Sequence, residues 1–167
     1  MPRLKRWLRE ATVMALIVAV ILFGMDWLRT PQLPESLVQQ PLSTLQGEAD
    51  LAQLSQQRPV LVYVWATWCG VCKLTTPAVA SLSQNGTQVV SVALRSGNDQ
   101  RVDTWLKKKG VQGVIVNDES GALSERWGIN ATPTFVVLYQ GEVASTTSGW
   151  TSSFGLKLRL WWAEKSA

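Results

Sequence analysis

A chain of 167 residues can hold one globular domain together with a short additional segment. Its formal charge of +4 is too small an excess to indicate nucleic-acid binding. Two cysteines and no histidine cannot supply the four Cys or His ligands of a structural zinc site, so we expect no such metal.

The N-terminus combines a basic flank with an apolar stretch. Residues 11–25 contain no charged side chain, and counting on to Leu28 brings the stretch close to the roughly 20 residues that a helix needs to cross a bilayer. Basic flanks stay in the cytoplasm. We therefore predict a cytoplasmic flank at residues 1–10 and a retained transmembrane signal anchor at residues 11–28. Four cations lie in the flank: Arg3, Lys5, Arg6 and Arg9.

A cleavable signal peptide is the main alternative, because the uncharged core is only moderately long. Such a peptide would end in a small-x-small site, which residues 22–25 do not supply. Trp27 is of the type that anchors at a membrane interface. We therefore expect an inner-membrane protein whose domain faces the periplasm, an oxidising compartment.

Residues 29–41 contain three prolines and several polar residues, a composition that predicts a spacer. The globular domain is then expected at residues 42–167. Its first elements are a short helix over residues 48–57, capped by Asp50, and a buried apolar strand over residues 59–65.

Cys69 and Cys72 follow that strand directly and open a helix predicted over residues 72–82. A Cys-x-x-Cys at a strand-to-helix junction puts the first sulfur at the helix N-terminus, where free N–H groups and the macrodipole lower a thiol pKa. The second sulfur, one turn along the same face, is close enough to form a disulfide. The pair predicts a redox-active dithiol/disulfide centre that needs no separate cofactor.

Other uses of the pair remain as alternatives. A structural disulfide is disfavoured, because closing so short a loop removes little chain entropy. A two-coordinate Cu(I) site stays open, because thiolates suit that ion, although the chain has no histidine and its three methionines are the initiator and two in the anchor. A docking protein that has kept a redox fold is the third alternative.

Strands and helices alternate through the rest of the chain. Their order, β-α-β-α-β-α-β-β-α, predicts an α/β fold in which an antiparallel hairpin completes an otherwise parallel sheet. The strands are expected over residues 88–94, 111–116, 135–139 and 142–147, and the helices over residues 99–109, 120–127 and 154–164.

Three segments of the chain resemble the thioredoxin-fold family. The segment Trp65-Ala66-Thr67-Trp68-Cys69-Gly70-Val71-Cys72-Lys73 resembles the family's active-site signature. Pro77 matches the proline of its active-site helix, and Thr132-Pro133-Thr134 matches its cis-proline segment. The strand and helix between Gln88 and Ser120 resemble the insertion of the membrane-tethered, cytochrome-maturation type. Within that type the chain is most similar to the suppressor-of-copper-sensitivity D proteins of proteobacteria.

The resemblance implies a central mixed sheet flanked by helices and a thiol:disulfide exchange activity. Cys69 would attack a substrate disulfide and Cys72 would resolve the mixed disulfide. Trp68 would offer apolar surface to a partner, or would simply pack against the domain. The resemblance further implies a cis Thr132–Pro133 bond beside the sulfurs. The residues expected to support the site are Trp68, Gly70, Val71, Thr132 and Pro133.

The partners implied are a disulfide-bearing periplasmic protein as substrate and a membrane thiol reductase as electron donor. Because Gly70 and Val71 place no charge between the cysteines, we expect net reduction of substrates, with oxidase or isomerase activity as the alternative. Copper tolerance and cytochrome c maturation are the processes that the resemblance suggests.

Two positions depart from the family's pattern. Thioredoxin keeps a buried acid where this chain has Tyr63, and cytochrome-maturation reductases often keep a glutamate where it has Thr75. Neither carboxylate is available to accept the proton of Cys72. Solvent, an ordered water or a group of the partner is expected to accept it instead.

Overall fold

The computed structural model describes residues 2–29, 33–34 and 36–166, and the chain divides into two compact units at Thr30. The first unit is one helix, α1 (Pro2–Arg29), on which Leu16 and Ile17 are exposed. Within the described residues, no helix combines the length and the apolar content of a membrane span. The anchor predicted from the sequence includes positions whose side chains lie outside the described ones, among them Leu22 and Phe23.

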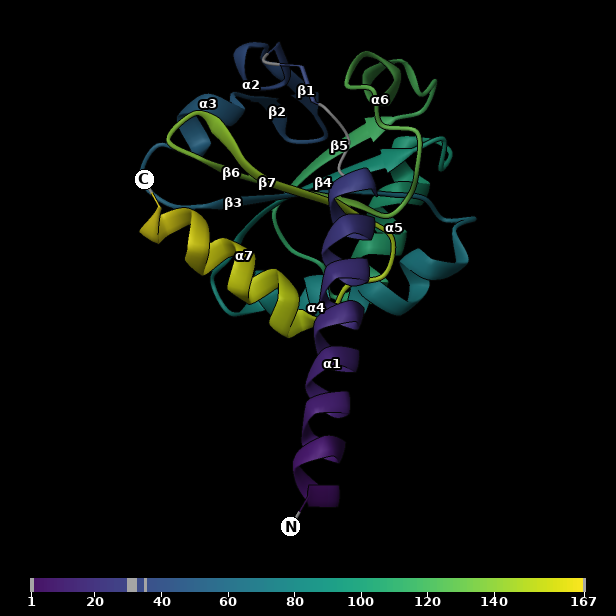
Figure 1. The fold of residues 1–167 in the computed structure, drawn as a ribbon. Coiled ribbons are helices and arrows are strands. Elements are labelled where there is room, and N and C mark those ends of the chain that lie inside the picture. The colour runs from purple at the N-terminus through teal and green to yellow at the C-terminus, as the bar shows by residue number, and fades with distance from the viewer. Residues whose placement is uncertain (1, 30–32, 35, 167) are drawn as a thin grey trace. The chain divides into compact units, whose positions relative to one another are not determined.

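A five-stranded sheet forms the centre of the second unit, in the order β5-β4-β3-β6-β7 (Figure 1). The first three of these strands along the chain run parallel, β6 is antiparallel to β3, and β7 is antiparallel to β6. The mixed sheet predicted from the order of elements is therefore confirmed. The strands are β3 (Val60–Trp65), β4 (Gln88–Leu94), β5 (Val114–Asp118), β6 (Thr134–Tyr139) and β7 (Glu142–Ser148).

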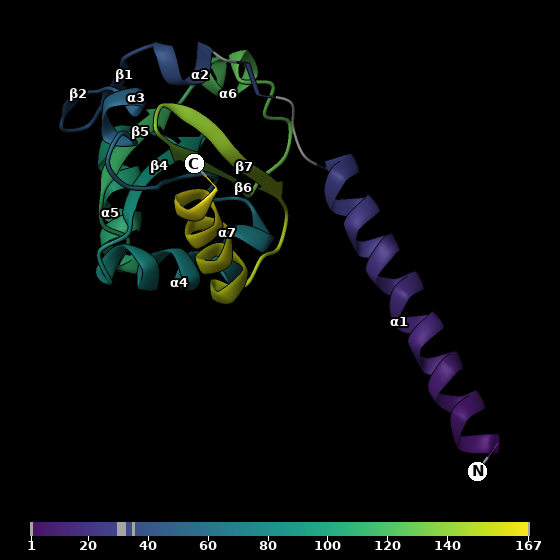
Figure 2. The ribbon, with the colours of Figure 1, turned by 60° about the vertical axis from the view of Figure 1, so that its left-hand side comes forward.

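Helices cover both faces of this sheet. On one face α4, α5 and α7 pack against the strands, and Figure 2 shows α4 and α7 side by side there. The other face carries α6 and the segments that precede β3. The bounds of the four helices are α4 (Gly70–Gln84), α5 (Asp99–Lys109), α6 (Ala122–Arg126) and α7 (Ser153–Lys165).

The central strand β3 is buried along its whole length. Because side chains alternate across a strand, Leu61, Tyr63 and Trp65 enter the cluster beneath α4. Val62 and Val64 enter the cluster on the opposite face. A strand buried on both faces has no freedom of register, so it delivers the turn that follows it, and hence Cys69, to a fixed place at the edge of the sheet.

Helix α5 matches its predicted range because both of its ends are coded locally. The Asn98 side chain caps the N-terminus by accepting the N–H of Arg101, and Gly110 ends the helix with a φ of 72°. The strand after it begins later than predicted, at Val114. Val111 instead donates its N–H to the carbonyl of Leu106 and so belongs to the end of the helix.

The segment before β3 differs from the prediction in two places. A helix was expected over residues 48–57, but β1 (Leu42–Thr44) and β2 (Gly47–Ala49) form a hairpin that takes up its first residues. The helix that remains, α3 (Leu51–Leu54), is capped as predicted by Asp50, whose side chain accepts the N–H of Gln53.

The predicted spacer is shorter than its proline content indicated. Residues 30–32 and 35 of it lie outside the described residues, whereas α2 (Ser36–Gln39) is part of the second unit. Leu37 and Val38 are buried in the cluster on the face opposite α4. Burial of two adjacent apolar side chains outweighs the extended bias of the prolines around them.

Candidate redox site

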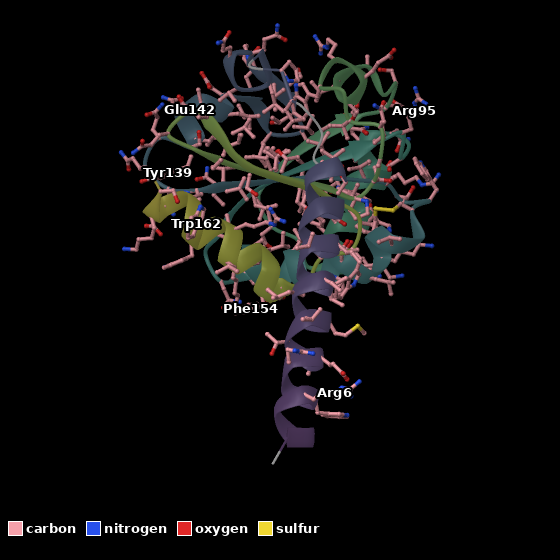
Figure 3. The ribbon with its side chains drawn as sticks, viewed as in Figure 1. Arg6, Arg95, Tyr139, Glu142, Phe154 and Trp162 are labelled. Carbon is pink, nitrogen blue, oxygen red and sulfur yellow. A yellow bond between two sulfur atoms is a disulfide. The ribbon has the colours of Figure 1, made fainter. Side chains whose placement is uncertain are left out.

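The cysteine pair lies where β3 passes into α4. Cys69 is the N-cap of the helix, and its sulfur accepts the N–H of Cys72 at 3.1 Å. The two residues form a disulfide, visible as a yellow bond in Figure 3, and their Cα atoms are 5.3 Å apart. The prediction that the first sulfur lies at a helix N-terminus beside the second is confirmed.

The two sulfur-bearing residues differ in exposure. Cys72 is fully buried, whereas Cys69 is 7% exposed and is flanked on the surface by Gly70, by Val71 and by Trp68 with 61% of its surface exposed. An incoming sulfur therefore meets Cys69 first.

The cis-proline segment lies beside the disulfide, as predicted. The Thr132–Pro133 peptide bond is cis, and the carbonyl oxygen of Thr132 lies 3.4 Å from the sulfur of Cys69. Pro133 is buried, and its own carbonyl accepts the N–H of Gly149 at 2.8 Å, which holds the segment against the chain after β7. Because β6 pairs with β3, residues 63 positions apart in the chain meet at the site.

Trp68 is held by a loop that the sequence did not single out. Its indole N–H donates to the carbonyl of Arg95 at 3.1 Å. Arg95 (labelled in Figure 3) has a φ of 45°, and its own N–H donates to the carbonyl of Asp118 while its guanidinium donates to that of Ser120. Nothing in the local sequence marks an arginine for the left-handed conformation, which glycine or asparagine ordinarily adopts.

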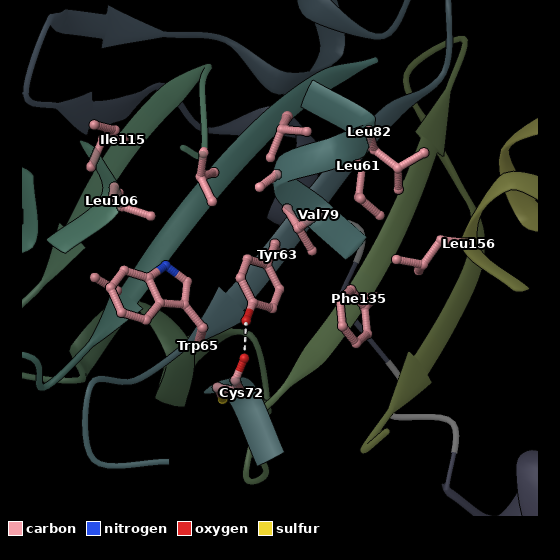
Figure 4. Close-up of a cluster of buried hydrophobic side chains, with 14 of the residues drawn as sticks. Leu61, Tyr63, Trp65, Cys72, Val79, Leu82, Leu106, Ile115, Phe135 and Leu156 are labelled. Carbon is pink, nitrogen blue, oxygen red and sulfur yellow. Dashed lines mark hydrogen bonds between the residues drawn. The ribbon is translucent and has the colours of Figure 1, made fainter. Parts of the chain in front are cut away.

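Three buried hydroxyl groups lie beneath Cys72. Figure 4 shows Tyr63 between Trp65 and Phe135, with its hydroxyl directed at the Cys72 carbonyl. The hydroxyls of Thr75 and Thr76 contact the same carbonyl. Burial raises the pKa of Tyr63 above its ordinary 10.0, and its hydrogen bonds with Thr75 and Thr76 partly offset that rise. The resemblance to the thioredoxin-fold family indicated Tyr63 and Thr75 as departures from its pattern, but it did not indicate Thr76.

The hydrogen bonds of this cluster join hydroxyl groups and backbone carbonyls and involve no carboxylate of the described residues. Among the described residues, the buried carboxyl group is that of Asp118, which accepts the N–H groups of Leu123 and Ser124 at the start of α6. No set of three or more His, Cys, Asp or Glu side chains within the described part of the chain could hold a metal ion.

The redox site lies beside exposed apolar side chains, those of Trp68 and Val71. A cavity of about 550 Å³ lies at the other end of β3, between Arg58, Gln88 and Trp161. The disulfide instead lies near the opposite end of β3, where Cys69, the less buried of the two cysteines, adjoins the Thr132 carbonyl. Exposed apolar side chains beside a backbone carbonyl suit an extended protein segment, because the carbonyl can accept an N–H of such a segment.

Known proteins with similar sequences carry out thiol chemistry. Residues 33–149 match the model of the Redoxin family. The chain is 44% identical over 163 residues to a thioredoxin-like protein of Haemophilus influenzae, an alignment that covers 97% of this chain and 98% of that protein. It is 30% identical over 139 residues to the thiol:disulfide interchange protein DsbE of Pseudomonas aeruginosa, which covers 75% and 74% of the two chains.

Solved structures share the same architecture. A secreted disulfide oxidoreductase of Mycobacterium tuberculosis superposes with a TM-score of 0.63 at 20% identity, covering 76% of this chain and 98% of that one. StoA of Bacillus subtilis superposes with a TM-score of 0.60 at 24% identity, covering 72% and 94%. At these identities the likeness establishes the fold alone.

Proposed function

The chain belongs to the Redoxin family and is a thioredoxin-like protein-disulfide oxidoreductase, and on that basis we propose that it is anchored in the inner membrane and reduces disulfides of periplasmic proteins. The observation that carries the proposal is the arrangement of the cysteine pair. Cys69 caps α4 and is the more exposed of the two, while Cys72 is buried behind it.

The reaction proceeds in two exchanges. The thiolate of Cys69 attacks one sulfur of the substrate disulfide, so that a mixed disulfide forms and the other substrate sulfur leaves as a thiolate. Cys72 then attacks the Cys69 sulfur, the bond to the substrate breaks, and the Cys69–Cys72 disulfide forms. The substrate gains two electrons and two protons, and a membrane thiol reductase returns the pair to the dithiol.

The helix N-terminus and the cis-proline segment support this division of roles. The N–H of Cys72 donates to the Cys69 sulfur, which favours the thiolate at that position. The Thr132 carbonyl beside the same sulfur can accept an N–H of a substrate strand. Trp68 and Val71 offer the apolar surface next to it.

A cysteine trap tests the proposed roles. Replacing Cys72 with Ser should leave the mixed disulfide unresolved, so that substrates accumulate on Cys69, whereas Cys69→Ser should trap none. Non-reducing gels of cells that express each variant distinguish the two outcomes. Accumulation of mixed disulfides on Cys69→Ser alone would reverse the assignment.

The direction of electron flow follows from how strongly the thiolate is stabilised. Strong oxidants over-stabilise it, whereas here Gly70 and Val71 add no charge to the effect of the helix N-terminus. We expect a potential more reducing than about −180 mV, the value typical of protein disulfide isomerase. Equilibration of the full chain with glutathione measures it, and thiol alkylation reports the state in cells. A potential near about −120 mV, with the pair oxidised in cells that contain the reductase, would contradict the proposal.

The anchor is supported by the sequence of the first 28 residues. Residues 11–25 carry no charge, four cations precede them, and Trp27 follows at the position of an interfacial residue. The Haemophilus influenzae relative aligns over 97% of the chain. Copper tolerance and cytochrome c maturation are the processes in which we propose that the substrates arise.

A further inference from the structure

The three hydroxyls beneath the second cysteine have no part in the exchange described above. They belong to Tyr63 on β3 and to Thr75 and Thr76 on α4, and all three residues are fully buried. Their oxygens lie 3.4, 3.2 and 2.6 Å, respectively, from the backbone carbonyl oxygen of Cys72. A carbonyl oxygen has two lone pairs, so the three cannot all donate to it at full strength.

The distances decide where each hydroxyl proton lies. Thr76 donates to the Cys72 carbonyl, because that 2.6 Å contact is the shortest of the set. Its oxygen is then free to accept from Tyr63, whose hydroxyl is 3.0 Å away. Thr75 donates to the carbonyl of Cys72 or of Val71, the latter at 3.3 Å. The result is a hydrogen-bonded chain from Tyr63 through Thr76 to Cys72, in which each bond polarises the next.

The same part of α4 also contains Pro77, which lies inside the helix. Proline has no N–H, and its ring crowds the carbonyl four residues earlier, which is that of Lys73. Thr75 and Thr76 both donate back to carbonyls four residues earlier, a pattern that bends helices. The hydroxyls of Thr75 and Thr76 therefore bear on the geometry of the turn that carries the cysteines.

The hydrogen-bonded chain formed by Tyr63 and Thr76 also carries no charge. Burial raises the pKa of Tyr63, so the phenol keeps its proton at every pH at which the enzyme would work. The buried carboxyl group of Asp118 is engaged at α6. These neutral hydroxyl groups can orient Cys72, but they do not remove the proton of its thiol.

We propose that the Tyr63–Thr76 hydrogen-bonded chain positions Cys72 for the second exchange, and that Tyr63 and Thr76 are positioning residues of this enzyme. The inference rests on the roles proposed above for Cys69 and Cys72. In that step Cys72 gives its proton to water, its sulfur bonds to the Cys69 sulfur, and the bond from Cys69 to the substrate breaks. The substrate sulfur leaves as a thiolate and takes a proton from water. Loss of these hydrogen bonds slows the second exchange, because the attacking sulfur of Cys72 is then less well aligned. The first exchange, the attack by Cys69, is unaffected.

Four variants separate the hydroxyls from the packing around them. Tyr63→Phe removes the phenolic hydroxyl and keeps the ring that stacks on Trp65 and Phe135. Thr76→Val replaces the hydroxyl with a methyl group, and Thr76→Ser retains it. Ser91→Ala is the matched control, because it removes a buried hydroxyl that accepts the indole N–H of Trp65 at 2.7 Å and is not one of the Tyr63, Thr75 and Thr76 hydroxyls.

Rapid acid quenching measures the two exchanges separately. The reduced full chain in detergent is mixed with glutathione disulfide, and mass spectrometry follows the Cys69–glutathione mixed disulfide and the final intramolecular disulfide. We expect Thr76→Val to resolve the mixed disulfide about 5- to 10-fold more slowly and Tyr63→Phe about 2- to 5-fold more slowly. In both variants the first exchange should change by less than about twofold. Thr76→Ser and Ser91→Ala should behave as the native chain.

Resolution at the native rate in Tyr63→Phe and Thr76→Val would overturn the proposal, and so would equal slowing of both exchanges. If Thr76→Val does not fold, Tyr63→Phe decides alone. The rate of the second exchange, measured against pH, gives a further test. An ionisation that appears in the native protein and disappears in Tyr63→Phe would contradict the proposal that the hydrogen-bonded hydroxyls are neutral. Failure of Cys72→Ser to accumulate the glutathione adduct at Cys69 would instead overturn the proposed function, whatever the hydroxyl variants do.

Discussion

Cys69 is both the N-cap of α4 and the more exposed cysteine, and its position allows both roles. As the N-cap of α4 it accepts the N–H of Cys72, and as the more exposed cysteine it presents its sulfur to the surface. An N-cap side chain is by nature an acceptor that is half outside the helix. The same geometry therefore stabilises a thiolate and leaves it accessible.

Selective alkylation tests this position directly. In the reduced chain near neutral pH, iodoacetamide should label Cys69 well before Cys72, because Cys72 is buried and Cys69 lies at the helix N-terminus. Peptide mass spectrometry after short exposure measures the ratio. Earlier labelling of Cys72 would show that the roles of the two residues are exchanged.

Tyr63 predicts a loss of stability at alkaline pH. Its folded-state pKa is raised by burial above 10.0, so above about pH 10 the unfolded chain releases the phenolic proton while the folded chain retains it. The folded state then binds more protons, and the free energy of unfolding falls as the pH rises through the folded-state pKa. Urea unfolding at about pH 8 and about pH 11 should show a larger loss for the native chain than for Tyr63→Phe. Equal losses would mean that Tyr63 is not the group responsible.

At the scale of elements, β3 and the turn after it account for the place of the site. All six residues of β3 are buried, and the strand pairs with β4 on one side and β6 on the other. The cysteine pair follows one end of β3, and the cis-proline segment precedes its neighbour β6. Antiparallel pairing of β3 with β6 brings the C-terminal end of β3 and the N-terminal end of β6 to the same edge of the sheet.

The helix α2 gives a stability prediction, because it was expected to be spacer. Leu37 is fully buried, so Leu37→Ala should lower the free energy of unfolding by about 2–5 kcal/mol. Gln39→Ala, at an exposed position of the same helix, should change it by less than about 0.5 kcal/mol. Denaturant unfolding compares the two variants. A negligible effect of Leu37→Ala would show that residues 36–39 do not stabilise the domain and belong to the spacer.

At the scale of the whole molecule, α2 shortens the tether to any membrane anchor. The second unit begins at Pro31, and Leu33 already packs against its core, so few residues separate it from the proposed anchor, which ends at residue 28. Each fully extended residue spans at most about 3.6 Å. We therefore expect the enzyme to act on substrates close to the membrane surface, where a membrane-embedded reductase could also reach it.

Fusion reporters test the proposed topology. Alkaline phosphatase joined after Arg29 should be active, because the basic flank holds the preceding residues in the cytoplasm. The N-terminal sequence of the membrane-extracted protein should begin at Met1 or its near neighbour. Soluble periplasmic protein that begins after about residue 25 would show a cleaved signal peptide instead.

Local sequence was sufficient for much of the domain and for the reacting pair. Residues 88–94 and 99–109 form their elements at the predicted bounds, because burial runs and helix caps are coded within a few residues. Cys69 and Cys72 could be assigned to a helix N-terminus for the same reason. Where tertiary burial competed with local signals, as at residues 36–39, the prediction was wrong.

Only the tertiary structure assembled the surroundings of the disulfide. Family resemblance indicated Thr132 and Pro133, but pairing of β3 with β6 brings them to Cys69 across 63 positions. Arg95 reaches Trp68 through a left-handed backbone conformation, and Thr76 joins Tyr63 through packing of α4 on β3. Such contacts depend on which strands are neighbours and which helix covers them. Those choices are made by burial over the whole domain, so no window of local sequence contains them.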